Sequence, residues 1–333
     1  MLTLNTPKNI KIILKIGLTL IFHSQKPKFA IVNECVEFSK KFKKHKLVNA
    51  ILRKVLREKE NFENKKENLP ESFKENIDKI FSSKNIRSYI YKSLFLKPIN
   101  FQISITKTNK ALYQKRVFHL KNKLNSNCFV QDIGNFECIH SVKDLFHSKD
   151  ILDTCAAPGG KSILFYSYGF NVKAIDKSFN QIKKFRQNVT RLKLNLKISQ
   201  RDFLNFNDKK KYQSILLDAP CSALGTFRRN PDVITKIEDK KIQNNHKIQF
   251  EMIEKSLNLL NKEGILVYIV CSFHPFETMG VIDKVTQKHK NISLLNIQSD
   301  KMIKKRNGYF INPFSFSEFG GSDIFFVSAM KKK

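Results

Sequence analysis

The chain has 333 residues, 41% of them hydrophobic, which is enough for one large globular domain and one or two small ones. Its 61 lysines and arginines outnumber 29 aspartates and glutamates, giving a formal net charge of +32. That excess favours a nucleic-acid partner, although an AT-rich genome also produces chains that are rich in Lys, Asn, Ile and Phe and lack Trp. The six cysteines form no C-x-x-C pair and have no histidine at zinc-ligand spacing. They disfavour a metal site and favour reduced thiols in the cytoplasm.

Residues 1–60 are expected to be helical. The apolar run 10–22 contains two lysines and is too short to span a membrane, and no small-residue cleavage site follows it, so a buried helix is the better interpretation. Apolar residues recur along 47–56 at the spacing of one helix face. The basic cluster at 40–46 has two open readings, a solvated helix end or an edge that contacts RNA.

Residues 61–140 are expected to hold a linker and a small α+β domain. The stretch 58–68 is charged and polar, as is typical of a linker. A short helix and strand-like segments such as 101–105 follow, but no pattern here indicates a function.

Residues 141–333 alternate between apolar strands and helices. This alternation predicts a doubly wound, Rossmann-like α/β domain. The expected strands cover 151–154, 172–175, a short stretch near 198, 214–218 and 265–270, with a turn and closing strand at 320–327. The expected helices cover 162–168, 179–192 and 246–260.

The loops after three successive strands predict a pocket for a nucleoside cofactor. Residues 155–161 end one strand and open a helix, so their backbone N–H groups face a ligand. Asp176 ends the next strand and can bind ribose hydroxyls, and Asp202 is placed to reach an adenine edge. A P-loop is disfavoured because it needs glycine where Cys155 stands, and because Pro158 lacks an N–H. The nicotinamide-binding fingerprint G-x-G-x-x-G is absent.

Two cysteines follow buried strands at the carboxyl edge of the predicted sheet. Cys221 comes after 214–218, beside Asp218, and Cys271 comes directly after 265–270. Thiols at this edge are suited to covalent attack on an electrophilic ring carbon. A thiolate that adds to C6 of a pyrimidine makes C5 nucleophilic, and Asp218 can hydrogen-bond the N3 and N4 edge of the ring. The second cysteine can then assist release.

These motifs resemble a known family. The blocks 153–161, 217–222 and 270–272 are similar to the signature sequences of the NOL1/NOP2/Sun family of RNA cytosine-5 methyltransferases. Residues 225–232 resemble, more narrowly, its bacterial members that act on 16S ribosomal RNA at a cytosine of the 967 type. Residues 26–56 are similar to a NusB-like RNA-binding domain, here shortened at its start.

The resemblance implies a domain order and a set of partners. A helical NusB-like segment (1–60) and the small α+β linker domain (61–140) would precede a Rossmann-like class I S-adenosylmethionine-dependent methyltransferase domain (141–333). The implied cofactor is S-adenosylmethionine. The implied partner is 16S ribosomal RNA, before the subunit is fully assembled. The protein is expected to be cytoplasmic and monomeric, with no metal and no membrane association.

The resemblance also implies the role of each residue in the site. Cys271 is the expected nucleophile and Cys221 the product-release cysteine, while Lys161 would lie near the cofactor or target base. Arg228 and Arg229 would contact RNA phosphate, or else form an ordinary basic loop. The residues expected to hold the cofactor are Cys155, Ala156, Ala157, Pro158, Gly159, Gly160, Lys161, Asp176, Asp202 and Asp218.

Two departures from the family pattern leave a second hypothesis open. Val270 stands where the family usually has Thr, and the acidic segment after the nucleophile is reduced to Pro275-Phe276-Glu277. A non-catalytic RNA-binding factor for ribosome assembly would tolerate both changes. An N-methyltransferase is disfavoured, because residues 218–221 are not the Asn/Asp-Pro-Pro-aromatic run that such an enzyme needs.

Overall fold

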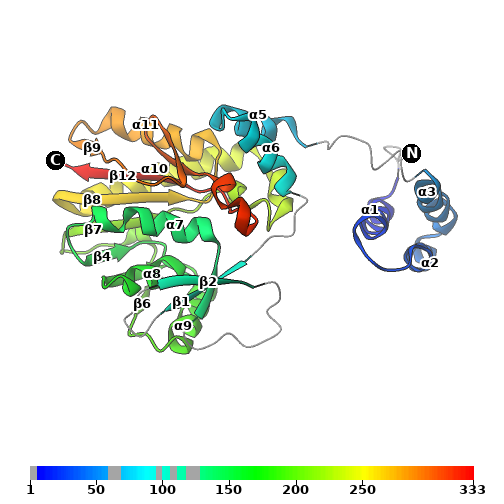
Figure 1. The fold of residues 1–333 in the computed structure, drawn as a ribbon, viewed down its shortest axis with the longest axis horizontal. Coiled ribbons are helices and arrows are strands. Elements are labelled where there is room, and N and C mark those ends of the chain that lie inside the picture. Colours follow the sequence, from blue (N-terminus) through cyan, green and yellow to red (C-terminus); the bar gives the residue numbers. More distant parts are fainter. Residues whose placement is uncertain (1–5, 59–68, 95–99, 106–110, 118–127) are drawn as a thin grey trace. The chain divides into compact units, whose positions relative to one another are not determined.

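The computed structural model describes residues 6–58, 69–94, 100–105, 111–117 and 128–333 (Figure 1). The chain divides into two compact units, Met1–Leu69 and Pro70–Lys333. The expected break near residue 60 therefore lies close to the observed one. The expected break at 140 does not separate two units, because residues 70–140 belong to the same unit as the methyltransferase-like region.

The first unit contains three helices, α1 (Lys8–His23), α2 (Lys28–Ser39) and α3 (His45–Arg57), with a 3₁₀ turn η1 (Lys40–Phe42). The apolar run 10–22 lies in α1, but the predicted burial holds for one face only. Ile10, Ile13, Leu14 and Ile21 are buried, whereas Ile12 and Ile16 are 49% and 53% exposed. Leu14 packs in one cluster with Val48 and Leu52 of α3, all three fully buried. The basic residues of 40–46 are exposed around η1, apart from half-buried His45.

The second unit is built on a mixed sheet with the strand order β10-β11-β12-β8-β7-β4-β5-β6, and β9 also pairs with β12 (Figure 1). Its five central strands are parallel, and β12 joins them antiparallel beside β8. The strands are β4 (Asp150–Asp153), β5 (Asn171–Asp176), β6 (Ile198–Gln200), β7 (Tyr212–Asp218), β8 (Leu260–Val270), β9 (Ile292–Leu294), β10 (Met302–Lys305), β11 (Gly308–Ile311) and β12 (Phe326–Lys332). This confirms the predicted Rossmann-like α/β fold.

Helices connect the parallel strands. The α-helices are α7 (Ile133–Val142), α8 (Gly160–Ser167), α9 (Phe179–Arg191), α10 (Asp239–Leu259) and α11 (Met279–Lys288). The 3₁₀ helices are η2 (Lys143–Leu145), η3 (Phe203–Asn205), η4 (Leu224–Thr226), η5 (Pro231–Lys236), η6 (Pro275–Glu277) and η7 (Pro313–Phe319). Helix α10 starts seven residues before its predicted start at 246. The prediction misses this first part because residues 239–245 are polar and show little of the apolar pattern that marks a helix.

The closing strand differs from its prediction at 320–327. Gly320 and Gly321 both adopt positive φ, 83° and 81°, and end η7, so β12 begins only at Phe326. The segment between crosses the ends of the central strands instead of extending the sheet. There Ile324 donates its backbone N–H to Gly225 O at 3.0 Å.

The described elements between Pro70 and Gln131 belong to the second unit and do not form a unit of their own. Helices α5 (Glu71–Ile80) and α6 (Lys84–Ser93) precede a three-stranded sheet of β1 (Asn100–Ile105), β2 (Ala111–Val117) and β3 (Cys128–Gln131). Phe73 lies in α5, and Phe81 directly follows the helix; both side chains are buried. The ring of Phe81 lies 6.1 Å from the ring of Phe310 in β11. Burial of these large aromatic rings explains why α5 belongs to the second unit and not to a separate domain.

No helix in the described part of the chain is both long enough and apolar enough to cross a membrane. The same residues contain no cluster of three or more His, Cys, Asp or Glu side chains arranged to hold a metal ion.

Candidate active site

The predicted site residues meet at the carboxyl edge of the central sheet. Strands β7 and β8 are parallel neighbours, with Asp218 opposite Ile269, so the loops after both strands leave the sheet side by side. Backbone contacts continue this pairing into the loops, since Gly225 donates its N–H to Cys271 O at 2.9 Å. A Cβ at position 225 would lie 1.8 Å from Ile324 O, so only glycine allows this approach.

The two predicted catalytic thiols lie next to each other. Sγ of Cys221 and Sγ of Cys271 are 3.4 Å apart, and both residues are half-buried. The hydrogen bond to Cys271, together with burial, raises the pKa of Cys221 well above its usual value. The Cys221 thiol therefore keeps its proton at neutral pH.

Lys161 and Asp218 form a buried ion pair beside the thiols. Lys161 Nζ donates to Asp218 Oδ2 at 2.7 Å, and its side chain is only 7% exposed. Burial alone would lower the pKa of Lys161, but the charge of Asp218 and the hydrogen bond to it raise that pKa. The ammonium also lies 5.4 Å from the centre of the Phe325 ring. Lys161 is thus a fixed cation that orients the Asp218 carboxylate.

Burial raises the pKa of two further groups, one at the end of β4 and one in the loop after it. Burial raises the pKa of Asp153 to about 7, although its Oδ2 accepts a 2.6 Å hydrogen bond from Ser162 Oγ. Burial likewise raises the pKa of Cys155 well above its usual value, so this third cysteine remains a thiol.

A cavity of about 290 Å³ opens where the cofactor is expected. It is lined by Thr154, Cys155, Ala157, Asp176, Lys177, Ser178, Asp202, Phe203, Asp218, Ala219, Pro220, Cys221, Ala223, Met252 and Cys271. It therefore brings together the predicted carboxylates of three strands and both reactive thiols.

The donor set of this cavity fits a nucleoside. Asp176 is held in place because its Oδ2 accepts from the Ala157 N–H at 3.1 Å and its Oδ1 accepts from the Ser178 N–H at 2.8 Å. Asp202 Oδ1 caps η3 by accepting from the Leu204 N–H at 3.1 Å. Carboxylate oxygens can accept from ribose hydroxyls and an amino group. Apolar side chains in the lining provide contact for a flat base.

A second cavity, of about 330 Å³, adjoins the first and shares Cys155, Ala157 and Asp218 with it. It is polar, and several buried side-chain atoms in its lining have no hydrogen-bond partner: both amide atoms of Gln131, Oδ2 of Asp132, Oδ1 of Asn135 and Oδ1 of Asp153. Unpartnered buried polar atoms are costly unless a ligand or water satisfies them. Three of these residues, Gln131, Asp132 and Asn135, are not among the predicted site residues; they lie at the end of β3 and the start of α7, where no motif marks them.

The structure corrects the expected role of Arg228. Its side chain is 1% exposed and donates from Nη1 to Gly320 O at 2.5 Å, with Asp132 3.6 Å and Asp323 3.9 Å from the guanidinium. It therefore joins three distant segments of the fold and does not face solvent, where an RNA phosphate would lie. Arg229 is different, because its side chain is 34% exposed and lines the second cavity while bonding to Asp323 at 2.9 Å.

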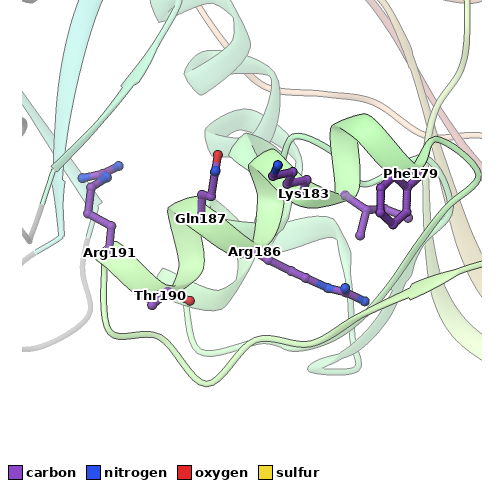
Figure 2. Close-up of a pocket in the computed structure, with 7 residues that line it drawn as sticks. Phe179, Lys183, Arg186, Gln187, Thr190 and Arg191 are labelled. Atoms are coloured by element: carbon purple, nitrogen blue, oxygen red, sulfur yellow. The ribbon is translucent and has the colours of Figure 1, made fainter.

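A cavity of about 670 Å³ lies along the outer side of α9 (Figure 2). Phe179 lies at one end of the row of side chains and Arg191 at the other, with Lys183 and Arg186 between them. This cavity offers cations and one exposed aromatic ring but no thiol or carboxylate. It is therefore suited to holding an anion and not to the covalent chemistry of the cysteine pair.

The fold and the site together define a class I methyltransferase. The sheet order, the nucleoside pocket at the ends of β4 to β6 and the reactive groups after β7 and β8 are its defining parts. The chain belongs to the 16S rRNA methyltransferase RsmB/F family, whose model matches residues 143–331. The NusB family model matches residues 4–57. The family resemblance inferred from the sequence is confirmed, and S-adenosylmethionine is the cofactor of this family.

Curated relatives carry one name. The ribosomal RNA small subunit methyltransferase B of Photorhabdus laumondii subsp. laumondii is 32% identical over 209 residues, which cover 61% of this chain and 47% of that protein. The protein of the same name from Serratia proteamaculans is 33% identical over 183 residues, covering 54% and 42%. The chain thus spans about half the length of the curated relatives it matches.

Two solved structures share the fold. The crystal structure of PH0851 superposes with a TM-score of 0.73 at 17% identity, over 97% of this chain and 82% of that one. NSun6 from Pyrococcus horikoshii gives a TM-score of 0.55 at 24% identity, over 66% and 56% of the two chains. At these identities the likeness bears on the fold alone.

Proposed function

We propose that this protein transfers a methyl group from S-adenosylmethionine to C5 of a cytosine in ribosomal RNA, with 16S RNA as the substrate. The observation that carries the proposal is the 3.4 Å approach of the Cys221 and Cys271 thiols at the edge of the nucleoside pocket. The name of the family and of the curated relatives supports ribosomal RNA as the substrate.

The cofactor is assigned to the 290 Å³ cavity. Asp176 would bind the ribose hydroxyls and Asp202 the adenine edge, with Cys155 and Ala157 beside them. Among the other predicted cofactor residues of this loop, Ala156, Pro158, Gly160 and Lys161 line the adjoining cavity. When bound, the cofactor supplies an electrophilic methyl group on a sulfonium. The lining of Phe203, Pro220 and Met252 excludes water from the flat base.

Cys271 is assigned as the nucleophile. Its thiolate would form a bond to C6 of the cytosine and make the electron pair of the C5–C6 double bond available at C5. C5 would then take up the methyl group as the bond between that group and the sulfonium sulfur breaks, and S-adenosylhomocysteine would leave. The resemblance of residues 270–272 to the family signature supports Cys271 as the nucleophile, and the raised pKa of Cys221 keeps that second thiol protonated beside it. Asp218, oriented by Lys161, would accept a hydrogen bond from the N4 amino group, and the Lys161 ammonium beside it would offset the negative charge that develops in the ring.

Cys221 is assigned to product release. After methylation the C5 proton leaves, and its bonding electrons restore the C5–C6 double bond as the Cys271 sulfur departs. Cys221 lies 3.4 Å from that sulfur and is the group best placed to assist this step. The net reaction releases one proton and regenerates the thiolate.

The target base is assigned to the place where the two cavities meet at Asp218, because Cys271, which must reach C6 of the base, lines the first of them. RNA phosphate would meet exposed cations, among them Arg229 and the side chains along α9 (Figure 2). The NusB-like unit is proposed to add RNA affinity. We also propose a cytoplasmic location, since the proposed substrate is an RNA of the cytoplasmic ribosome. A monomer is proposed as well.

The non-catalytic alternative gains no support from the two departures that raised it. Val270 is fully buried in β8, so it does not face the reacting groups, and Glu277 keeps its carboxylate beside both cysteine loops.

One assay separates the two hypotheses. The protein is incubated with tritiated S-adenosylmethionine and 16S RNA, and bisulfite sequencing then locates any methylated cytosine. The proposal predicts label at C5 of cytosine. RNA binding without label would support the non-catalytic factor.

A further inference from the structure

Glu277 is a fully buried carboxylate that lies between the two cysteine loops. Its Oε1 accepts from the backbone N–H of Ser222 at 2.7 Å and from Asn245 Nδ2 at 2.8 Å. Its Oε2 accepts from the hydroxyls of Ser222 at 2.5 Å and Ser272 at 2.6 Å. Four donors therefore satisfy this charge without a salt bridge among the interactions of the described residues, and two of its three partner residues directly follow a catalytic cysteine.

We propose that Glu277 is a positioning residue that holds Cys221 beside Cys271. The inference rests on the proposed function, since it assigns a role in the same reaction. Two pairs of side chains run in parallel across the loops: the sulfurs are 3.4 Å apart, and the hydroxyls of Ser222 and Ser272 are 3.2 Å apart. Glu277 bonds to both hydroxyls, so it fixes the second pair and through it the first.

The loops need such a clamp because the sheet does not hold them. The ladder between β7 and β8 ends at Asp218, and the last backbone bond that continues it runs from Ala219 N to Ile269 O at 2.9 Å. Cys221 lies two residues beyond that bond. Beyond that bond, the contacts between the loops in the described structure include the backbone bond from Gly225 to Cys271, the contact of the Phe227 and Phe273 rings, and the cysteine and serine pairs that Glu277 organises.

Glu277 is itself fixed to the fold. Its carbonyl oxygen accepts from the hydroxyl of Tyr268 at 2.7 Å, and Tyr268 is a fully buried residue of β8. Its N–H donates to His274 O at 3.0 Å, which closes the 3₁₀ turn η6. Through Glu277, both loops are therefore held at a fixed distance from strand β8. This matters because a displacement of 1 Å in an active site can lower the rate by about 100-fold.

Two substitutions of Glu277 can distinguish a role in positioning the loops from a role that needs the negative charge. In Glu277→Gln the amide oxygen can accept from the Ser222 N–H and Asn245, while the amide NH₂ donates to the two hydroxyls, which can reverse and accept. The bridge would then survive without its negative charge. In Glu277→Ala the whole bridge is lost. A positioning residue is thus rescued by glutamine, whereas a residue acting through its charge is not.

The test compares Glu277→Gln, Glu277→Ala and Ser272→Ala with the matched control Glu251→Gln, an exposed acid of α10. Methyl transfer is measured as kcat and as KM for S-adenosylmethionine. Thiol proximity is measured without RNA, as the rate at which diamide, which takes up two electrons and two protons, oxidises Cys221 and Cys271 to a disulfide identified by peptide mass spectrometry. Circular dichroism confirms that each variant is folded, and Ser272→Ala replaces Glu277→Ala if the latter does not fold.

We expect Glu277→Ala to lower kcat by about 100-fold with KM within about twofold, and to slow disulfide formation about tenfold. Glu277→Gln should stay within about threefold of the wild type in both assays. Unchanged disulfide formation in Glu277→Ala and Ser272→Ala would overturn the inference, as would a glutamine variant as defective as alanine. If the wild type transfers no methyl group but disulfide formation still depends on Glu277, the proposed function fails while the clamp stands.

Discussion

The aromatic cluster behind the cysteine loops gives a sharp prediction for stability. Phe73 of α5 is fully buried, and its ring lies edge-on to those of Phe227, at 5.4 Å, and Phe273, at 5.5 Å. The rings of Phe227 and Phe273 are themselves 6.2 Å apart. Phe273 comes two residues after Cys271, and Phe227 follows the glycine that contacts Cys271. Phe73 thus supports both loops from behind.

The perturbation is Phe73→Ala. Removing a buried phenylalanine side chain costs about 3–5 kcal/mol of the free energy of unfolding. Each edge-on pair adds about 0.5–1.5 kcal/mol, which places the expected loss in the upper half of that range. For a unit of this size each kcal/mol lowers the melting temperature by about 2–4 °C, so a decrease on the order of 10 °C is expected.

The assay is urea and thermal unfolding followed by circular dichroism, because the chain has no tryptophan. The control is Phe179→Ala, whose side chain is 63% exposed and whose loss should change the free energy of unfolding by no more than about 0.5 kcal/mol. A loss below about 1 kcal/mol for Phe73→Ala would refute the packing of α5 against the loops, because it falls outside the range for a buried aromatic ring.

Two other substitutions test the electrostatics of the site. Burial raises the pKa of Asp153 in the folded state from 3.8 to about 7. The unfolded chain therefore loses this proton at lower pH than the folded protein does, so the free energy of unfolding of the wild type falls as pH rises from about 4 to about 7, by up to about 4 kcal/mol. Asp153→Asn lacks this titration, so its melting temperature relative to the wild type should be higher at pH 8 than at pH 5. Parallel profiles would contradict the burial argument. Lys161→Met removes the cation that orients Asp218 and should lower kcat for methyl transfer by about 100-fold. A kcat close to that of the wild type would show that the ion pair has no part in the reaction.

The sequence predicted which side chains meet at one edge of the sheet, because their positions depend on local patterns. Each cysteine directly follows or closely follows a continuous apolar strand, and parallel strands bring such ends to one edge of a sheet. Asp176 and Asp218 end their strands in the same way. Burial of the strands on both faces makes them easy to identify from the residues alone.

Features that depend on long-range contacts could not be predicted. Arg228 reads as part of a basic loop, yet it is buried because Asp132 and Asp323, both far away in sequence, converge on it. Glu277 read as the remnant of a reduced acidic segment, whereas its four donors come from three separate elements. The partners in both cases are brought together only by the completed fold.

The central claim is that Cys271 attacks the base and Cys221 releases the product. It is tested most directly by incubating each variant with S-adenosylmethionine and labelled 16S RNA, and then resolving protein–RNA adducts on a denaturing gel. Cys221→Ala should accumulate a covalent adduct, while Cys271→Ala and the double variant should form none and transfer no methyl group. An adduct in Cys271→Ala, or full methyl transfer by that variant, would contradict the account.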